Sequence, residues 1–497
     1  MLEKNKVGVI SFSDPRKEIS FAPEQEKYIK NSHNKLVNFL TSGGIEVFSP
    51  QDKIKKGKNT FGINSLEELN RCIKEFKKDE VEAIIIGCWH WSEPHFVVNL
   101  SRALDIPILL YNEANPEWAG ITAMSAFSAS LWEVAPNNSA LKHEKIVDDL
   151  EGVISWIKGA CALGKMRKKA LLLWGGSYCL HMDHLRDDPA MLKSFFIGDI
   201  LNEGQLILSK KADYIIKNQG KRIIDFISWL KSKNTRIVYD IKMLNQDVLK
   251  KQIALYFAAK DRLKELEDEN IAGVSIKCQP ELSVEYGVTP CFLPAFLPYS
   301  VDSEGPKDII PTVCEGDLKG LLSAVLGFFI NPHLPPLFGD LKFISNDYII
   351  ISNCGASSIY YAYNSLSPEE VLPRITIQGQ CQGKSGGAIG YNGIEGILTI
   401  LKLIRVSGEY FMLSGVGESL NIDEKIRKHI VWGKMWPHIA VALGINKDIF
   451  LKVAGSNHFV AIPGDYSAEI NYACRIAGIP VVRIDNNNRM EDFFENL

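Results

Sequence analysis

The sequence predicts two doubly wound α/β domains with parallel sheets, followed by a β-rich C-terminal domain. Three observations support this fold class. Apolar runs alternate with helical spacing up to about residue 165, the alternation restarts at residue 170, and short strands separated by Gly and Asn dominate after residue 345. Such alternation is typical of parallel sheets covered by helices, and short strands between turns are typical of antiparallel domains. We therefore expect domains at 1–165, 166–344 and 345–497.

The first domain shows the α/β pattern most clearly. Val7-Gly8-Val9-Ile10-Ser11-Phe12 is an apolar run suited to a strand buried on both faces. Apolar spacing then predicts helices at 24–40, 66–76 and 96–104, and further strands at 45–48, 81–87 and 106–111.

The other two domains are predicted in the same way. In the second, strands are expected at 170–174, 236–240 and 273–277, with helices at 189–201, 221–232 and 246–268. In the third, strands are expected at 348–352, 374–377, 393–401, 409–413, 450–454 and 479–484, with a helix at 467–477.

Composition excludes several classes of protein. The 497 residues are 46% hydrophobic and 23% charged, which is ordinary for a globular protein, and the net charge of −3 provides no field for nucleic acid or anionic lipid. No apolar run is long enough to span a bilayer, and the N-terminus lacks the pattern of a secretion signal. The ten cysteines include no Cys-x-x-Cys pair. We expect a cytoplasmic protein without disulfides.

Three segments have the chemistry of a divalent-cation site. Glu315 follows the strand-like Thr312-Val313-Cys314, Asp340 follows Phe338-Gly339, and His458 follows Ala454-Gly455-Ser456-Asn457. We expect three short strands to end in these residues and to converge. Carboxylate oxygens suit Mn²⁺ or Mg²⁺, and one imidazole favours Mn²⁺. Each residue taken singly is more often an ordinary turn or core residue.

Three other segments are weaker candidates. His90 and His95 lie in the loop after residue 86, without a carboxylate at matching spacing. His181 and His184, with Asp187 and Asp188 nearby, have ligand-like chemistry, but the acids are interpreted as caps of the next helix, and the loop could still face substrate. Residues 379–387 contain Gly-Lys-Ser, but their spacing differs from a phosphate loop, and we expect a glycine-rich β loop.

The three ligand segments, in this order and at this spacing, resemble those of L-fucose isomerase. The resemblance implies two α/β domains and a β-rich domain, Mn²⁺ (or Mg²⁺ or Co²⁺) held by Glu315, Asp340 and His458, and a homo-oligomer, hexameric or trimer-based, with active sites between subunits. It also implies sugar contacts. These fall on Arg16, Trp89, Gln279, Trp436 and Asn457.

The resemblance implies a metal-dependent isomerase that converts a free aldose into its ketose by enediol proton transfer, with Glu315 and Asp340 as acid and base. The sugar is expected to be like L-fucose or D-arabinose, or a 6-substituted hexose. Ser352-Asn353-Cys354-Gly355 departs from the family's Asn-Ser-Gly-Ser, so substrate choice stays open, and an anionic substituent at C6 would have Arg16, Arg186 or Lys384 as partners. The alternatives are a sugar-binding or regulatory protein without catalysis, and a metal-dependent hydrolase.

Overall fold

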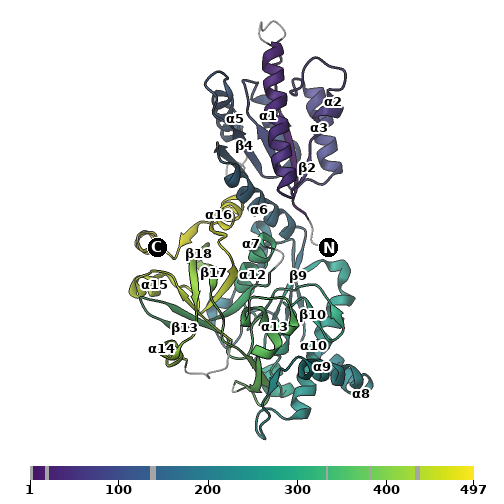
Figure 1. The fold of residues 1–497 in the computed structure, drawn as a ribbon, viewed down its shortest axis with the longest axis vertical. Coiled ribbons are helices and arrows are strands. Elements are labelled where there is room, and N and C mark those ends of the chain that lie inside the picture. The colour runs from purple at the N-terminus through teal and green to yellow at the C-terminus, as the bar shows by residue number, and fades with distance from the viewer. Residues whose placement is uncertain (1–3, 17–21, 135–141, 332–333, 381, 431–436) are drawn as a thin grey trace. The chain divides into compact units, whose positions relative to one another are not determined.

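The computed structural model describes residues 4–16, 22–134, 142–331, 334–380, 382–430 and 437–497 (Figure 1). The chain forms two compact units. Unit 1 comprises Met1–Lys165 and Ala468–Ile479, and unit 2 comprises Met166–Ser467 and Pro480–Leu497. This division into two units does not test the expected domains at 1–165, 166–344 and 345–497, which stay predictions.

Unit 1 is built on a five-stranded parallel sheet with strand order β2-β1-β3-β4-β5. Its central strands β3 and β4 are buried along their whole length, as their continuous apolar sequences predict. The strands are β1 (Lys6–Ser11), β2 (Glu46–Phe48), β3 (Ala83–Gly87), β4 (Ile108–Asn112) and β5 (His143–Val147). The helices are α1 (Ala22–Ser42), α2 (Gln51–Ile54), α3 (Leu66–Lys78), α4 (His95–Leu104), α5 (Gly120–Val134), α6 (Leu150–Met166) and, from the C-terminal part of the chain, α16 (Ser467–Ala477).

Unit 2 begins with a four-stranded parallel sheet of order β12-β9-β6-β7. Its strands are β6 (Ala170–Trp174), β7 (Asp199–Glu203), β9 (Ile271–Ile276) and β12 (Thr312–Cys314). The α-helices of this part are α7 (Pro189–Phe195), α8 (Leu206–Asn218), α9 (Gly220–Ser232), α10 (Gln246–Glu265), α11 (Phe292–Phe296) and α12 (Leu318–Ile330). Short 3₁₀ or π turns cover Asp183–Leu185, Glu267–Glu269 and Glu281–Tyr286, and β10 (Val301–Asp302) pairs with β11 (Gly305–Pro306).

The second sheet of unit 2 is seven-stranded and mostly antiparallel, in the order β17-β20-β13-β14-β19-β18-β21. Because β17 also pairs with β18, six strands form a closed ring of pairings, with β21 outside it. Its strands are β13 (Leu337–Ile344), β14 (Ile349–Ser352), β17 (Gly396–Val406), β18 (Glu409–Leu420), β19 (His438–Ala442), β20 (His458–Pro463) and β21 (Val481–Arg483). The predicted fold class is confirmed.

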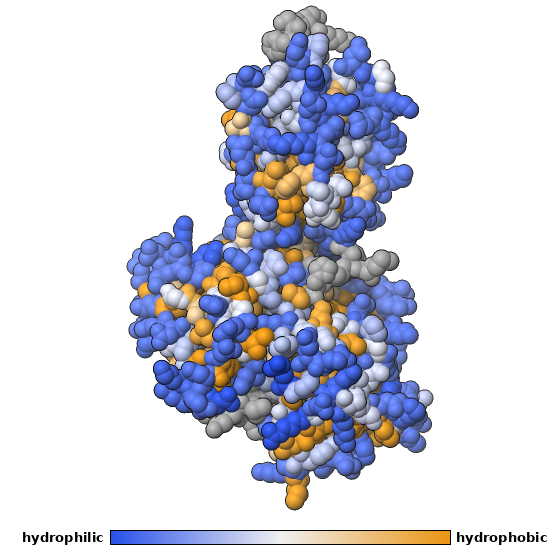
Figure 2. Space-filling model, in the orientation of Figure 1, coloured by the Kyte–Doolittle hydropathy of each residue, from blue (hydrophilic) through white to orange (hydrophobic). Residues whose placement is uncertain are grey.

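Smaller elements complete unit 2. A three-stranded sheet joins β8 (Arg236–Ile237), β15 (Thr376–Gly379) and β16 (Gly387–Gly390). The remaining α-helices are α13 (Pro368–Val371), α14 (Glu424–Arg427), α15 (Lys447–Val453) and α17 (Asn487–Glu495), and 3₁₀ turns cover Ile359–Ala362 and Leu372–Arg374. Hydrophilic residues dominate the visible surface, with hydrophobic patches between them (Figure 2). In the ranges that the structure describes, no helix is both long and apolar enough to cross a membrane.

Three local predictions meet a test in the structure. Residues 379–387 connect the antiparallel strands β15 and β16, which confirms a glycine-rich β loop. The predicted strand at 450–454 is wrong, because Asn446 caps the amides of Asp448 and Ile449 and starts helix α15 instead. The predicted helix 189–201 is too long, because α7 ends at Phe195 and β7 begins at Asp199.

Candidate active site

Glu315 stands at the carboxyl end of β12, where its backbone turns sharply. Its φ of 65° lies in the left-handed region that residues with a Cβ rarely adopt, and Gly316 follows with a φ of 70°. The Glu315 amide donates to the Ile276 carbonyl at 2.9 Å, which continues the pairing of β12 with β9. Left-handed residues of this kind concentrate at functional sites, where the surrounding structure maintains the strain.

Asp340 and His458 are brought together by strand register. They lie directly opposite each other on the antiparallel strands β13 and β20. Opposite residues of an antiparallel pair project to the same face of the sheet. His458 begins its strand and Asp340 lies within β13, so the expectation that both end a strand is wrong. The α15 helix and the Gly455–Ser456 turn precede His458 instead.

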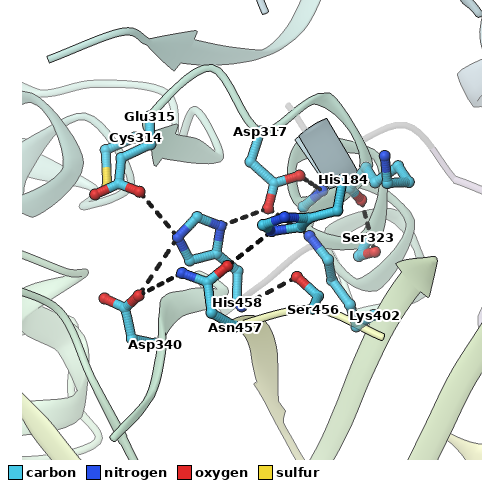
Figure 3. Close-up of polar contacts among 12 residues, drawn as sticks. His184, Cys314, Glu315, Asp317, Ser323, Asp340, Lys402, Ser456, Asn457 and His458 are labelled. Atoms are coloured by element: carbon cyan, nitrogen blue, oxygen red, sulfur yellow. Dashed lines mark hydrogen bonds and ion pairs between the residues drawn. The ribbon is translucent and has the colours of Figure 1, made fainter. Parts of the chain in front are cut away.

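The three side chains meet around one imidazole (Figure 3). The Nε2 atom of His458 lies 3.1 Å from Glu315 Oε2 and 3.5 Å from Asp340 Oδ1. The imidazole is buried, whereas the side chains of Glu315 and Asp340 keep 11% and 16% of their surface exposed. The carboxylates therefore form the side of the cluster that solutes can reach.

Asp317 holds the opposite side of the imidazole. Its Oδ2 lies 2.8 Å from His458 Nδ1, and the same oxygen contacts the buried Lys402 ammonium. Its Oδ1 accepts the Gly320 amide at 2.7 Å as the N-cap of α12. One carboxylate thus ties His458, the helix start and strand β17 together. Sequence reasoning missed both residues: the position of Asp317 before the apolar run 318–330 is a cap signal that could have found it, whereas no local signal points to Lys402.

Burial and neighbouring charges shift the pKa values of the cluster. Burial, reinforced by the Glu315 carboxylate, raises the pKa of Asp340 to about 6 although His458 opposes the shift. Burial alone would lower the pKa of His458, but hydrogen bonds with Asp317 and Glu315 raise it to about 9. Burial would raise the pKa of Asp317, but Lys402 and His458 hold it well below its usual range. Asp340 is therefore suited to proton exchange near neutral pH.

A second buried ion pair extends the network. Lys319 Nζ lies 2.8 Å from Asp187 Oδ1, and both side chains are almost fully buried. Burial raises the pKa of Asp187, and its Oδ2 has no hydrogen-bond partner among the described residues. Four carboxylates, those of Asp187, Glu315, Asp317 and Asp340, thus share this region with two ammonium groups, those of Lys319 and Lys402. With all six groups ionised the excess is two negative charges; the His458 imidazolium offsets one of them, and the full excess of two is present once a cation replaces the proton on Nε2.

This donor set fits a hard divalent cation. Donor atoms at right angles around an ion with bonds of about 2.1 Å lie about 3 Å apart, close to the separations of Nε2 from the two carboxylate oxygens. Asp317 on Nδ1 is the outer carboxylate that histidine ligands commonly carry, and a charge of +2 balances the excess. Among the described residues, no group of three or more His, Cys, Asp or Glu side chains already has the arrangement of a formed metal site. The cation therefore stays a proposal.

Asn457 and His184 extend the cluster outward. Asn457 Nδ2 donates to Asp340 Oδ1 at 2.9 Å, and Asn457 Oδ1 lies 2.8 Å from His184 Nε2 (Figure 3). His184 was a weak metal candidate from its spacing to His181. The neighbouring Asp188 caps the amides of Ala190 and Met191, which confirms its interpretation as a helix cap, whereas the same interpretation of Asp187 is wrong because Asp187 pairs with Lys319. The contact with Asn457 joins residues 273 positions apart, so local sequence carried no signal for it.

The other residues predicted to contact the sugar are Gln279, Arg16, Trp89 and Trp436. Gln279 lines a small pocket of unit 2 together with Cys314, Asn353 and Gln380. In unit 1, Arg16 is 63% exposed and donates from Nε to Asp14 Oδ1 at 2.9 Å. Trp89 is only 1% exposed, and its Nε1 donates to Ser11 Oγ at 2.9 Å. Trp436 lies outside the described residues. The roles of these four residues in sugar binding stay predictions.

The fold and site define a class of protein with parallel α/β sheets, a β-rich C-terminal region and a carboxylate–histidine cluster. Residues 351–485 match the family model of the L-fucose isomerase C-terminal domain. A sulfoquinovose isomerase from Alkalicoccus urumqiensis is 22% identical over 224 residues, which cover 44% of this chain and 46% of that protein. Residues 351–485 are therefore similar to the C-terminal domain of L-fucose isomerase, and the matched relative is an isomerase too.

The match to the curated relative spans less than half of either protein, so the relative's activity does not transfer directly. Among solved structures, the chain matches the periplasmic binding protein component of an arabinose transporter from Shewanella sp. ANA-3, bound to α- and β-L-arabinofuranose. That match is 11% identical and covers 54% of this chain and 80% of the other. Its TM-score is 0.15, and it carries no argument about fold or function.

Proposed function

We propose that this protein is a metal-dependent aldose–ketose isomerase that acts on a free sugar through an enediol. The observation that carries the proposal is the convergence of Glu315, Asp340 and His458, from three distant segments, on one partly exposed cluster. The matched family domain, residues 351–485, supports it because it contributes His458 to that cluster.

The two carboxylates would perform the proton transfers. One removes the proton from C2 of the open-chain aldose, and the other returns a proton to C1, which gives the ketose. Asp340 suits either duty because its pKa is raised to about 6. Asn457 fixes the orientation of Asp340 by donating to its Oδ1.

Glu315, Asp340 and His458 would hold the cation. We propose Mn²⁺ rather than Mg²⁺ because an imidazole is present, with Co²⁺ as an alternative. When bound, the cation supplies a positive charge that polarises the sugar carbonyl and acidifies the C2 hydrogen. Asp317 and Lys402 keep the imidazole in place from behind.

Two classes of sugar are proposed as the substrate. The matched relative is named a sulfoquinovose isomerase, which makes an aldohexose with an anionic group at C6 the first candidate. Arg186 lies near His184 in sequence and is 64% exposed, with its guanidinium 4.1 Å from the Tyr178 ring centre, so it is a candidate partner for such an anion. An uncharged sugar such as L-fucose or D-arabinose is the second candidate.

A substrate screen tests the proposal. Purified protein with Mn²⁺ is incubated with sulfoquinovose, glucose, L-fucose and D-arabinose in D₂O, and ketose formation is followed by NMR. We expect one aldose to give its ketose, with deuterium entering at the carbon that receives the proton if solvent exchange occurs. Activity should fall when a chelator removes the cation.

A matched pair of variants tests the proposed role of Glu315 in proton transfer. Glu315→Gln should lower turnover at least about 100-fold because the amide cannot accept the proton. Glu304→Gln, in the ion pairs of Arg222 and Lys260, should leave turnover unchanged. Sugar binding without turnover, in the presence of Mn²⁺, would instead favour the sugar-binding or regulatory alternative.

We further propose a homo-oligomer, hexameric or trimer-based, with sugar sites completed between subunits. This proposal rests on the match of residues 351–485 to the family's C-terminal domain and on the resemblance, which implies sites between subunits. Light scattering of the purified protein tests it, and a monomer that retains full turnover would contradict it.

A further inference from the structure

The loop at residues 175–184 packs against the turn that carries Glu315. Tyr178, Leu180 and His181 have positive φ values of 76°, 50° and 59°, so the loop is held in an unusual backbone conformation. At Gly316, an added Cβ would lie 2.8 Å from the Gly176 carbonyl oxygen. Cys179 Sγ also lies 3.3 Å from the Gln279 carbonyl oxygen. The loop thus places His184 beside the cluster.

The hydrogen bonds define which nitrogen of His184 is available. An ionised Asp340 only accepts, so the Asn457 amide nitrogen faces it and the amide oxygen faces His184. That oxygen is an acceptor, so His184 donates from Nε2–H. In the neutral imidazole, Nδ1 then carries the lone pair, and no described residue provides it with a hydrogen-bond partner. His184 is exposed, unlike the buried His458.

The proposed reaction needs a base that the cluster does not provide. Aldohexoses and aldopentoses are mainly cyclic hemiacetals in water, and enediol formation requires the open chain. Glu315 and Asp340 already exchange the carbon-bound protons in the proposed function. Opening the ring requires removal of the proton on the anomeric hydroxyl, which a positioned imidazole can accept.

We infer that His184 is the base that opens the sugar ring at this site. Nδ1 accepts the proton from O1, the C1–O5 bond breaks, the O1 electron pair forms the C1 carbonyl, and O5 takes a proton from a water molecule. The imidazolium then returns its proton to solvent, so protons balance. This inference rests on the proposed function and assigns its first step to a residue outside the predicted ligand set.

Exchange NMR tests this step separately from isomerisation. Interconversion of the α and β anomers of L-fucose passes through the open chain, and the wild-type protein with Mn²⁺ should accelerate it. His184→Gln retains a donor for Asn457 but has no basic nitrogen, so we expect about 100-fold slower catalysed exchange. His181→Gln, on the same loop, should match wild type. Mn²⁺ affinity and thermal unfolding should be unchanged in both variants.

The outcomes separate the two proposals. Anomer exchange at the wild-type rate in His184→Gln would overturn the inference, and so would loss of Mn²⁺ binding, which would show a structural role. If the wild-type protein accelerates anomer exchange but forms no ketose from any sugar in the screen, the proposed isomerase function is refuted and the proposed ring opening is supported. A wild-type protein that neither exchanges anomers nor forms ketose would refute both.

Discussion

At the residue scale, Asp317 decides which nitrogen of His458 faces the candidate site. Its carboxylate accepts from Nδ1, so Nε2 is the atom that points to Glu315 and Asp340. The contact is fully buried and shared with Lys402, which prevents the imidazole from rotating without breaking an ion pair.

Replacing Asp317 should weaken cation binding although the residue is not a proposed ligand. An Asn side chain still caps α12, but its amide no longer imposes one tautomer on His458. We expect Asp317→Asn to weaken Mn²⁺ binding 10- to 100-fold, measured by calorimetry on protein shown to be folded. Asp423→Asn is the control, because Asp423 caps α14 without contacting a histidine. Unchanged Mn²⁺ affinity in Asp317→Asn would contradict the positioning role.

His33 makes the stability of unit 1 depend on pH. It is buried between Ser11 Oγ at 2.9 Å and Ser49 Oγ at 2.8 Å, and burial lowers its pKa from 6.5 to about 4. Protonation of His33 therefore favours the unfolded state. The stabilisation that unit 1 gains from the neutral imidazole is fully present above pH 6.5 and is lost as the pH falls toward 4. Between pH 7.5 and 5 we expect a loss of about 2 kcal/mol from this group.

Urea unfolding at the two pH values measures that loss. His33→Gln should unfold more easily at pH 7.5 and should show a smaller decrease on acidification than wild type. His95→Gln removes an exposed histidine of the same unit and should retain the wild-type decrease. An equal pH dependence in His33→Gln and wild type would disprove the role of His33.

At the element scale, the turn after β12 and the 175–184 loop pack against each other. Both have left-handed backbone, and Gly316 is the contact between them. The position of Glu315 therefore depends on a loop that is remote in sequence.

Two glycine substitutions separate backbone strain from packing at this turn. Gly316→Ala adds strain at φ 70° and also a clash with the Gly176 carbonyl oxygen, whereas Gly408→Ala, at φ 94°, adds strain in open space. We expect Gly316→Ala to be less stable than Gly408→Ala by at least about 1 kcal/mol in urea unfolding. Similar losses in the two variants would show that the loop contact contributes nothing.

At the scale of the whole molecule, the chain returns to unit 1 after unit 2 is nearly complete. Within unit 1, the α16 helix contacts the N-terminal part of the chain through Glu469, which accepts from Ser155 Oγ at 3.1 Å, and through Arg475, which pairs with Glu144 at 2.6 Å. Unit 1 therefore needs both the beginning and a late part of the chain to fold.

A substitution of Gly159 on α6 tests the contact between α6 and α16. An added Cβ would lie 2.4 Å from the Glu469 carbonyl oxygen, whereas at Gly164 on the same helix the nearest atom would be 3.4 Å away. We expect Gly159→Ala to lower hydrogen-exchange protection across α16 and α6 at least tenfold, and Gly164→Ala to preserve it. Protection in β17 and β18 should stay unchanged in both variants. Unchanged protection of α16 in Gly159→Ala would show that the helix does not depend on this contact.

Local sequence was sufficient for most of the elements. The apolar run at 83–87 became the buried strand β3, and Asp188 capped α7 as its position before Pro189 predicted. These features depend on neighbours within a few residues, so periodicity and capping chemistry reveal them. The strand expected at 450–454 failed because a capping Asn outweighed the apolar pattern.

Local sequence was not sufficient to determine which site residues lie together. The convergence of residues 315, 340 and 458 was expected from their ligand chemistry and from the family resemblance, since no periodic pattern relates positions so far apart. Only the tertiary structure placed Lys402 behind Asp317, His184 beside Asn457 and Asp340 opposite His458 in register. The physical reason is that side-chain chemistry and local backbone preference are encoded in short segments, whereas strand pairing and buried charge compensation arise only when distant segments pack together.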